Sequence, residues 1–329
     1  MRPFQYERAA SPARAVSSAD AGSKYHAGGT TLIDLMKLDV WRPERLIDIS
    51  ALKEPRMTRI ERNGKALRIG SMVTMAALAG DEGVRRSCPV LTDSLWLAAS
   101  AQLRNMARLG GNVLQMTRCS YYRDTSYDQC NKRAPGSGCA ALDGSNRHHA
   151  ILGTSDACIA TYPGDWAQAL IALDAVVEIL GKDGPKSVPF ATLHRQPGNR
   201  PDVETTLAAG DLITAFVIPD ADWARSKYLK IRDRESYAFA LTSAAVALRM
   251  DGDAVSDVRI GLGGVATVPW RATAAEAVLK NAALSEDTAQ QAAEAAFAGA
   301  NTLEHNAYKV ELGKRTLVRA LMDTAGMEA

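Results

Sequence analysis

Four of the five cysteines lie in one polar stretch, residues 117–158, which is punctuated by glycine and lacks the period of a helix. Ten, eight and eighteen residues separate the neighbours, which are Cys119, Cys130, Cys139 and Cys158. Zinc fingers and ribbons use paired C-x-x-C spacing, which this stretch lacks. Irregular spacing is compatible with an iron–sulfur cluster, and metal bonds would replace the missing apolar core. The alternative is that these thiols are incidental.

Three other candidates for metal or thiol chemistry have simpler explanations. Cys88 precedes Pro89, outside the cysteine-rich stretch, and we expect it to be a buried apolar residue. His148 and His149 could be ligands or a proton relay, but an exposed pair of loop histidines is the simpler expectation.

Two Gly-Gly pairs mark places where two successive residues have no side chain. Gly28 and Gly29 precede two threonines, whereas Gly110 and Gly111 precede an asparagine. Successive peptide N–H groups at such turns suit phosphate oxygens. Neither pair has the G-x-G-x-x-G spacing of a dinucleotide fold or the lysine of a P-loop, so an ordinary strand-to-helix turn stays open. Two such turns favour a cofactor held from both sides.

Three charged residues could contact a ligand. Asp165 stands just before an expected helix, where it would cap the N-terminus or bind a ligand hydroxyl. Lys230 and Arg232 are two apart on an expected strand and share a face. They could balance an anionic group, or they could be solvent-exposed strand charges.

The composition fits a globular protein of two domains. The chain has 329 residues, 47% of them hydrophobic and 23% charged, with a formal net charge of +2. Lys and Arg are scattered, which gives no reason to expect nucleic-acid binding. The N-terminal stretch MRPFQYERAASPARA lacks the apolar segment of a secretory signal, so export of this chain on its own account is not expected. The cysteines are therefore interpreted as ligands or free thiols instead of disulfides.

The pattern of elements is mixed α+β, without the regular alternation of a doubly wound fold. Strands are expected around 4–7, 46–49 and 212–218, with a hairpin over 60–70 whose turn is Asn63-Gly64. Helices are expected around 31–37, within 90–106, over 166–173 and from 273 to the end, with a domain boundary near 221–225.

Six motifs in this order resemble the flavin-binding subunit of the xanthine dehydrogenase / molybdenum hydroxylase family. They are AGGTTL (27–32), LRIG (67–70), GGNV (110–113), PGDWAQALIALDA (163–175), YLKIRDRESYAFA (228–240) and LGGVATVPWRA (262–272). The segments CSYYRDTSYDQCNKRAPGSGC and ILGTSDACIATYPGD are similar to an insertion found in the periplasmic aldehyde oxidoreductase (PaoABC) type of that family.

The resemblance implies a fold and two cofactors. Residues 1–223 would form a PCMH-type (vanillyl-alcohol-oxidase-like) FAD-binding domain, with the insertion at about 117–158. Residues 224–329 would form a C-terminal domain like that of the CO dehydrogenase flavoprotein, a small sheet with helices. The insertion would carry a [4Fe–4S] cluster on Cys119, Cys130, Cys139 and Cys158.

The resemblance also assigns FAD contacts to fourteen residues. They are Tyr25, His26, Ala27, Gly28, Gly29, Thr30, Thr31, Leu32, Arg108, Gly111, Asn112, Asp165, Ile213 and Lys230. Thr31 departs from many relatives, which have Asp or Asn there, so its particular hydrogen bond differs although the turn is kept.

The function that the resemblance implies is electron transfer, with no bond made to the organic substrate by this chain. A molybdopterin-binding large subunit would oxidise an aldehyde, and a small subunit would pass electrons through its [2Fe–2S] centres to FAD and then to an external acceptor. The chain would reach the periplasm by co-export with a signal-bearing partner, the alternative being the cytoplasm. Other readings are a stand-alone flavin oxidase or dehydrogenase of this fold, and a metal-stabilised assembly module without redox work.

Overall fold

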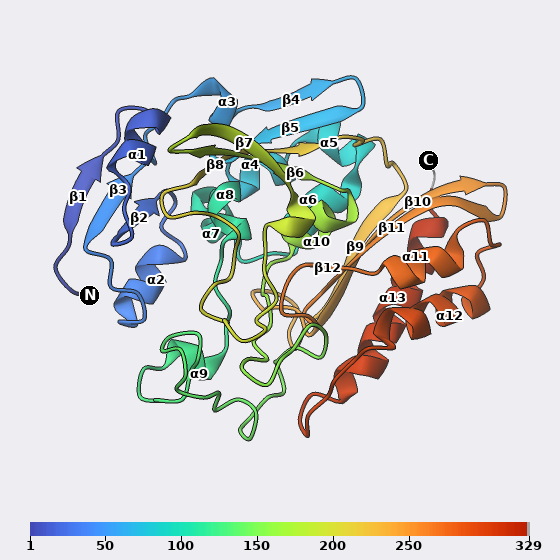
Figure 1. Cartoon of the computed structure of the whole chain (residues 1–329). Coiled ribbons are helices and arrows are strands. Elements are labelled where there is room, and N and C mark those ends of the chain that lie inside the picture. Colours follow the sequence, from blue (N-terminus) through green and yellow to red (C-terminus); the bar gives the residue numbers. More distant parts are fainter. Residues whose placement is uncertain (328–329) are drawn as a thin grey trace.

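The computed structural model describes residues 1–327, and these form three sheets with helices packed around them (Figure 1). The α+β class expected from the sequence is confirmed. None of the helices within these residues is long and apolar enough to cross a bilayer.

The N-terminal sheet has three parallel strands in the order β1-β3-β2. Its elements alternate along the chain: β1 (Gln5–Arg8), α1 (Pro12–Ser18), β2 (Ser23–His26), α2 (Leu32–Lys37) and β3 (Arg45–Asp48). Parallel neighbours need crossovers, which α1 and α2 provide. The carboxyl ends of β2 and β3 therefore meet at one edge, where His26 stands opposite Asp48 in the register.

The central sheet has five antiparallel strands in the order β4-β5-β8-β6-β7. They are β4 (Ile60–Asn63), β5 (Ala66–Gly70), β6 (Val176–Gly181), β7 (Gly184–Pro189) and β8 (Leu212–Ile218). The expected hairpin forms between β4 and β5, but Asn63 pairs with Ala66, so Gly64 and Lys65 make the turn. Gly64 supplies the positive φ of +58°.

Short helices cover the central sheet. They are α3 (Pro55–Thr58), α4 (Met75–Ala79), α5 (Glu82–Ser87), α6 (Pro89–Trp96), α7 (Ala101–Met106), α8 (Leu109–Val113), α10 (Trp166–Ala172) and the 3₁₀ turn η1 (Phe190–Thr192). Their core includes Trp166, whose ring meets that of Phe216 edge-on at 5.0 Å between centroids. Cys88 is fully buried in this core, as expected.

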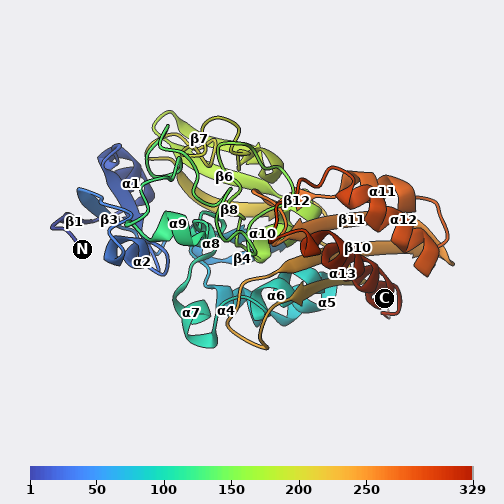
Figure 2. The same ribbon diagram turned by 90° about the horizontal axis from the view of Figure 1, so that it is seen from below.

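The C-terminal sheet is antiparallel, in the order β12-β11-β10-β9. Its strands are β9 (Ser226–Ile231), β10 (Thr242–Asp251), β11 (Ala254–Gly263) and β12 (Trp270–Arg271). Helices α11 (Thr273–Leu279), α12 (Glu286–Phe297) and α13 (Tyr308–Ala325) cover one face, and α6 and α10 contact the other (Figure 2). Being covered on both faces, β10 is buried along most of its length, which explains its unbroken apolar run.

The boundary predicted after residue 223 falls between β8 and β9. Side chains from both sides share one core, since Trp166 and Phe216 belong to the same cluster as Tyr228 and Ala245. The boundary therefore stays a prediction.

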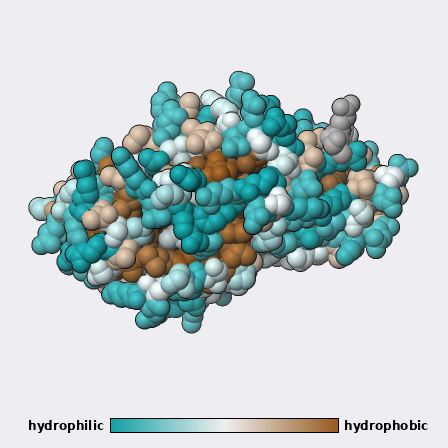
Figure 3. Space-filling model, turned by 90° about the horizontal axis from the view of Figure 1, so that it is seen from above, coloured by the Kyte–Doolittle hydropathy of each residue, from teal (hydrophilic) through white to brown (hydrophobic). Residues whose placement is uncertain are grey.

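Residues 117–158 contain one short helix, α9 (Ser120–Arg123), and otherwise consist of turns and isolated bridges. In Figure 1 this stretch extends away from the sheets, beside α9. The face seen in Figure 3, on the opposite side from that of Figure 2, is mostly hydrophilic, with hydrophobic side chains showing in the hollows between polar ones.

Candidate functional site

A large cavity of about 490 Å³ opens between the N-terminal sheet and the central sheet. The turn after β2, the α8 turn, the start of β8 and the loop before β8 all contribute to its wall. Among the fourteen predicted cofactor contacts, ten line it: Tyr25, Ala27, Gly28, Gly29, Thr30, Thr31, Leu32, Arg108, Gly111 and Ile213. Two stretches that the sequence places eighty residues apart thus meet at one cavity, as the paired Gly-Gly turns suggested.

The first glycine turn has no room for side chains. A Cβ on Gly28 would lie 2.1 Å from the carbonyl oxygen of Met106, and Gly29 has a φ of +72°. Any other residue at Gly28 would push the turn off the α7 backbone, while Gly29 holds a conformation that L residues rarely adopt. Glycine is therefore required at this turn because the packing leaves no room for a side chain. The absence of side chains also leaves the peptide groups of the turn along the cavity wall.

The second turn is bare for a different reason. A Cβ on Gly110 would approach Ser71 Cβ to 2.9 Å, whereas a Cβ on Gly111 would meet no atom of the described chain within 4 Å. Gly111 lines the large cavity, so its missing side chain leaves ligand space.

Two buried polar atoms on this wall fit a polar ligand. Ser71 Oγ and Arg108 Nε have no hydrogen-bond partner among the described residues, although Arg108 donates through Nη1 to the Met72 carbonyl at 3.0 Å. Buried polar atoms are normally paired. A phosphate-bearing cofactor such as FAD would supply acceptors for them, so the residues present fit that group.

His26 is not among the residues that line the cavity. Its Nδ1 lies 3.4 Å from Asp48 Oδ1. Tyr6 also donates to this carboxylate, as does the Ser50 amide at 2.9 Å. Burial raises the pKa of Asp48, but the hydrogen bonds from Ser50, Tyr6 and His26 outweigh it and hold that pKa well below its usual range.

Asn112 also lies outside the cavity wall. Its Nδ2 is 3.4 Å from Met75 Sδ, and its Oδ1 is buried with no partner within residues 1–327. Its predicted contact with a cofactor stays a prediction.

Asp165 and Lys230 pair with each other instead of facing the large cavity. The Lys230 ammonium lies 2.8 Å from Asp165 Oδ2 and donates to the Leu97 carbonyl at 3.0 Å. Tyr228 donates to Asp165 Oδ1 at 2.7 Å. Asp165 occupies the N-cap position of α10 but makes no capping bond within the described chain, so the prediction that it caps this helix is wrong. The expectation of exposed strand charges is also wrong for Lys230, whose side chain is 1% exposed.

The four cysteines of the insertion lie in one lobe. Cys130 and Cys139 face each other across an isolated antiparallel bridge, and Cys119 packs in clusters with each of them. Burial raises the pKa of the Cys119 thiol to about 12, and the neighbouring Cys130 and Cys158 add to the shift. Across residues 1–327, no three His, Cys, Asp or Glu side chains are arranged to hold a single metal ion.

His149 neighbours these cysteines, although the simpler expectation was an exposed pair of histidines. It is buried, not exposed as expected, and its Nε2 lies 3.1 Å from Cys119 Sγ. Burial lowers the pKa of His149 to about 4. His148 does point to solvent, its side chain 65% exposed. Both histidines lie in a turn, where no periodic pattern indicates which ring is buried.

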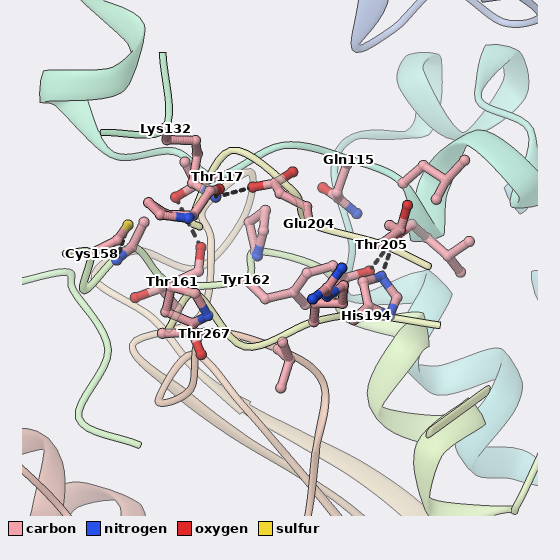
Figure 4. A pocket seen from close by; sticks show the side chains of 18 residues that line it. Gln115, Thr117, Lys132, Cys158, Thr161, Tyr162, His194, Glu204, Thr205 and Thr267 are labelled. Atoms are coloured by element: carbon pink, nitrogen blue, oxygen red, sulfur yellow. Dashed lines mark hydrogen bonds and ion pairs between the residues drawn. The ribbon is translucent and has the colours of Figure 1, made fainter. Parts of the chain in front are cut away.

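A second, smaller cavity of about 40 Å³ lies between the insertion and the loop after η1 (Figure 4). Cys158 and His194 contribute to its wall. Lys132 of the insertion points toward Glu204 across it, and the two form an ion pair. Lys132 and Glu204 also line the large cavity, so this pair stands between the two spaces. No local sequence pattern indicates this pair, because the partners are 72 residues apart.

Comparison with known proteins matches both halves of the chain to families. Residues 2–221 match the family described as "FAD binding domain in molybdopterin dehydrogenase", and residues 226–324 match the "CO dehydrogenase flavoprotein C-terminal domain".

Curated relatives include the aldehyde oxidoreductase FAD-binding subunit PaoB of Escherichia coli (strain K12), 45% identical, with 98% of each chain covered. The nicotine 6-hydroxylase medium subunit of Paenarthrobacter nicotinovorans is 28% identical, over 88% of this chain and 82% of the relative. Among solved structures, carbon monoxide dehydrogenase from Hydrogenophaga pseudoflava matches with a TM-score of 0.76 and 26% identity, covering 99% of both chains.

Proposed function

Because the chain belongs to the family of FAD-binding subunits of molybdenum hydroxylases, we propose that it is the FAD- and [4Fe–4S]-carrying electron-transfer subunit of a molybdenum-dependent aldehyde oxidoreductase. The observation that carries the proposal is the 45% identity with an aldehyde oxidoreductase subunit along almost the whole of both chains. The large cavity with its two glycine turns agrees with it.

The residues of the large cavity would hold FAD. Both turns line the cavity with backbone groups, while Ser71 Oγ and Arg108 Nε are buried donors without a partner within the described residues. Gly111 leaves space for the ligand. Bound FAD supplies the ability to accept a pair of electrons and release them one at a time. The protein orients it and limits its contact with water.

The four cysteines of the insertion would hold a [4Fe–4S] cluster. What supports this is the ligand set, four thiols in one lobe that has little regular structure of its own. Four thiolates are the usual ligands of such a cluster, and metal bonds stabilise segments that lack a core.

The partners of the proposed complex are a molybdopterin-binding large subunit and a [2Fe–2S] small subunit, which together with this chain make a heterotrimer. Electrons would enter from the small subunit and leave to an external acceptor. The proposed location is the periplasm, reached by co-export in the folded state with a signal-bearing partner. Fractionation of cells that express all three subunits tests the location.

Cofactor analysis of the purified chain tests the function. We expect about one FAD, together with iron and acid-labile sulfide close to four each, per chain after anaerobic expression. Cys119→Ser should lose most of the iron and keep FAD, whereas Cys88→Ser, outside the insertion, should keep both. Iron without flavin would point to an assembly module, and aldehyde oxidation by the isolated chain would point to a stand-alone flavoenzyme. Either result would overturn the proposal.

A further inference from the structure

Two side chains of the insertion line the large cavity, although the insertion is separate in sequence from both glycine turns. Tyr122 is buried, with its side chain packed near Leu35 of α2. Lys132 lies against the part of the wall that residues 202–213 form, the loop before β8 and the start of that strand. The insertion thus contributes to the flavin cavity itself.

Lys132 holds that loop through two contacts. Its ammonium donates to the Pro201 carbonyl at 2.9 Å and to the Glu204 carboxylate. The Lys132 side chain is only 9% exposed, so it has few other partners. The Glu204 side chain is 27% exposed, so the pair is partly buried, and removing one member leaves the charge of the other without its partner.

The insertion is also fastened on the α2 side. Arg123 donates to both oxygens of Asp34, at 2.8 and 3.1 Å, and Arg118 reaches the same carboxylate at 3.3 Å. Asp34 belongs to α2, the helix that follows the Gly28-Gly29 turn. The insertion therefore connects the helix after the first glycine turn with the loop before β8.

We propose that the insertion forms part of the flavin site, and that Lys132 is a positioning residue that holds residues 201–204 against the cavity through Glu204. This deepens the proposed function and rests on it for the identity of the ligand. Lys132 is two residues beyond Cys130 and lines the smaller cavity together with Cys158.

Titration of the flavin-free full-length chain with FAD tests the proposal, with quenching of flavin fluorescence as the readout. We expect Lys132→Met and Glu204→Gln each to raise the Kd for FAD about tenfold. The double variant should bind little worse than either single one, because both remove the same interaction. Lys132→Arg keeps the charge and should stay within about threefold of wild type.

The control is Lys227→Met, which removes a lysine paired with Asp323 at 3.1 Å in the C-terminal domain. It should leave the Kd unchanged. If Lys132→Met binds FAD as tightly as wild type, the proposal is overturned. Should Lys132→Met fail to fold by circular dichroism, Glu204→Gln decides on the same criterion. Failure of the wild-type chain to bind FAD would overturn the proposed function instead.

Discussion

The Lys230 ammonium and the Asp165 carboxylate lie 2.8 Å apart in the interior, with 1% and 5% of their side chains exposed. One belongs to β9 and the other precedes α10, so the pair joins the C-terminal sheet to the helices of the central core. Tyr228 donates to the second carboxylate oxygen, which leaves the pair well satisfied.

Replacing Lys230 with Met should destabilise the flavin-free chain by about 3–5 kcal/mol, because the Asp165 charge then stays buried without its cation. Urea unfolding at pH 7 measures this. Lys227→Met, which breaks a half-exposed pair with Asp323, should cost less than about 1 kcal/mol. Equal losses of unfolding free energy in the two variants would contradict the conclusion that Lys230 and Asp165 form a buried, stabilising ion pair.

The two glycine turns should respond differently to substitution. Gly28→Ala is expected to lower the free energy of unfolding by about 2 kcal/mol or more, because its Cβ would collide with the Met106 carbonyl. Gly111→Leu should leave the melting temperature nearly unchanged, because its Cβ points into open space within the described structure. It should still raise the Kd for FAD about tenfold or more, since the side chain would enter the cavity. A Gly111→Leu protein that binds FAD normally would count against the site.

The sequence predicted the fold class and many of the residues that line the large cavity, because both depend on local signals and motifs. Gly28 and Gly111 are recognisable from the bare backbone at a turn, and the resemblance assigned both to the flavin site. The hairpin over 60–70 was likewise marked by Asn63 and Gly64, although the register places the turn one residue later.

Long-range pairing could not be read from the sequence. Nothing near Lys132 indicates Glu204, and nothing near Asp165 indicates Lys230, because each contact is set by how distant elements pack. Nothing near His26 indicates Asp48 either, because the two residues meet only through the pairing of β2 with β3. Burial of His149 depends on the shape of a loop, for which no periodic pattern exists.

Acid should destabilise the protein through His194. Burial lowers the pKa of His194 to about 4 from 6.5, while Nε2 donates to the Val113 carbonyl at 2.9 Å. The unfolded chain therefore binds more protons between pH 6.5 and 4, so stability falls as the pH drops through that window, by about 3 kcal/mol in total. Urea unfolding at pH 7 and pH 5 should show a smaller loss for His194→Gln than for wild type. The same loss in both would show that another group carries the effect.

His149 Nε2 lies 3.1 Å from Cys119 Sγ. If Cys119 ligates the proposed cluster, a ring N–H donated to its sulfur should favour the reduced state, because hydrogen bonds to sulfur raise the reduction potential. His149→Leu should therefore lower the midpoint potential of the cluster, measured by a redox titration followed by electron paramagnetic resonance. His148→Leu is the matched control, because its ring is exposed and should leave the potential unchanged. Equal potentials for His149→Leu and wild type would show that the ring does not act on the cluster.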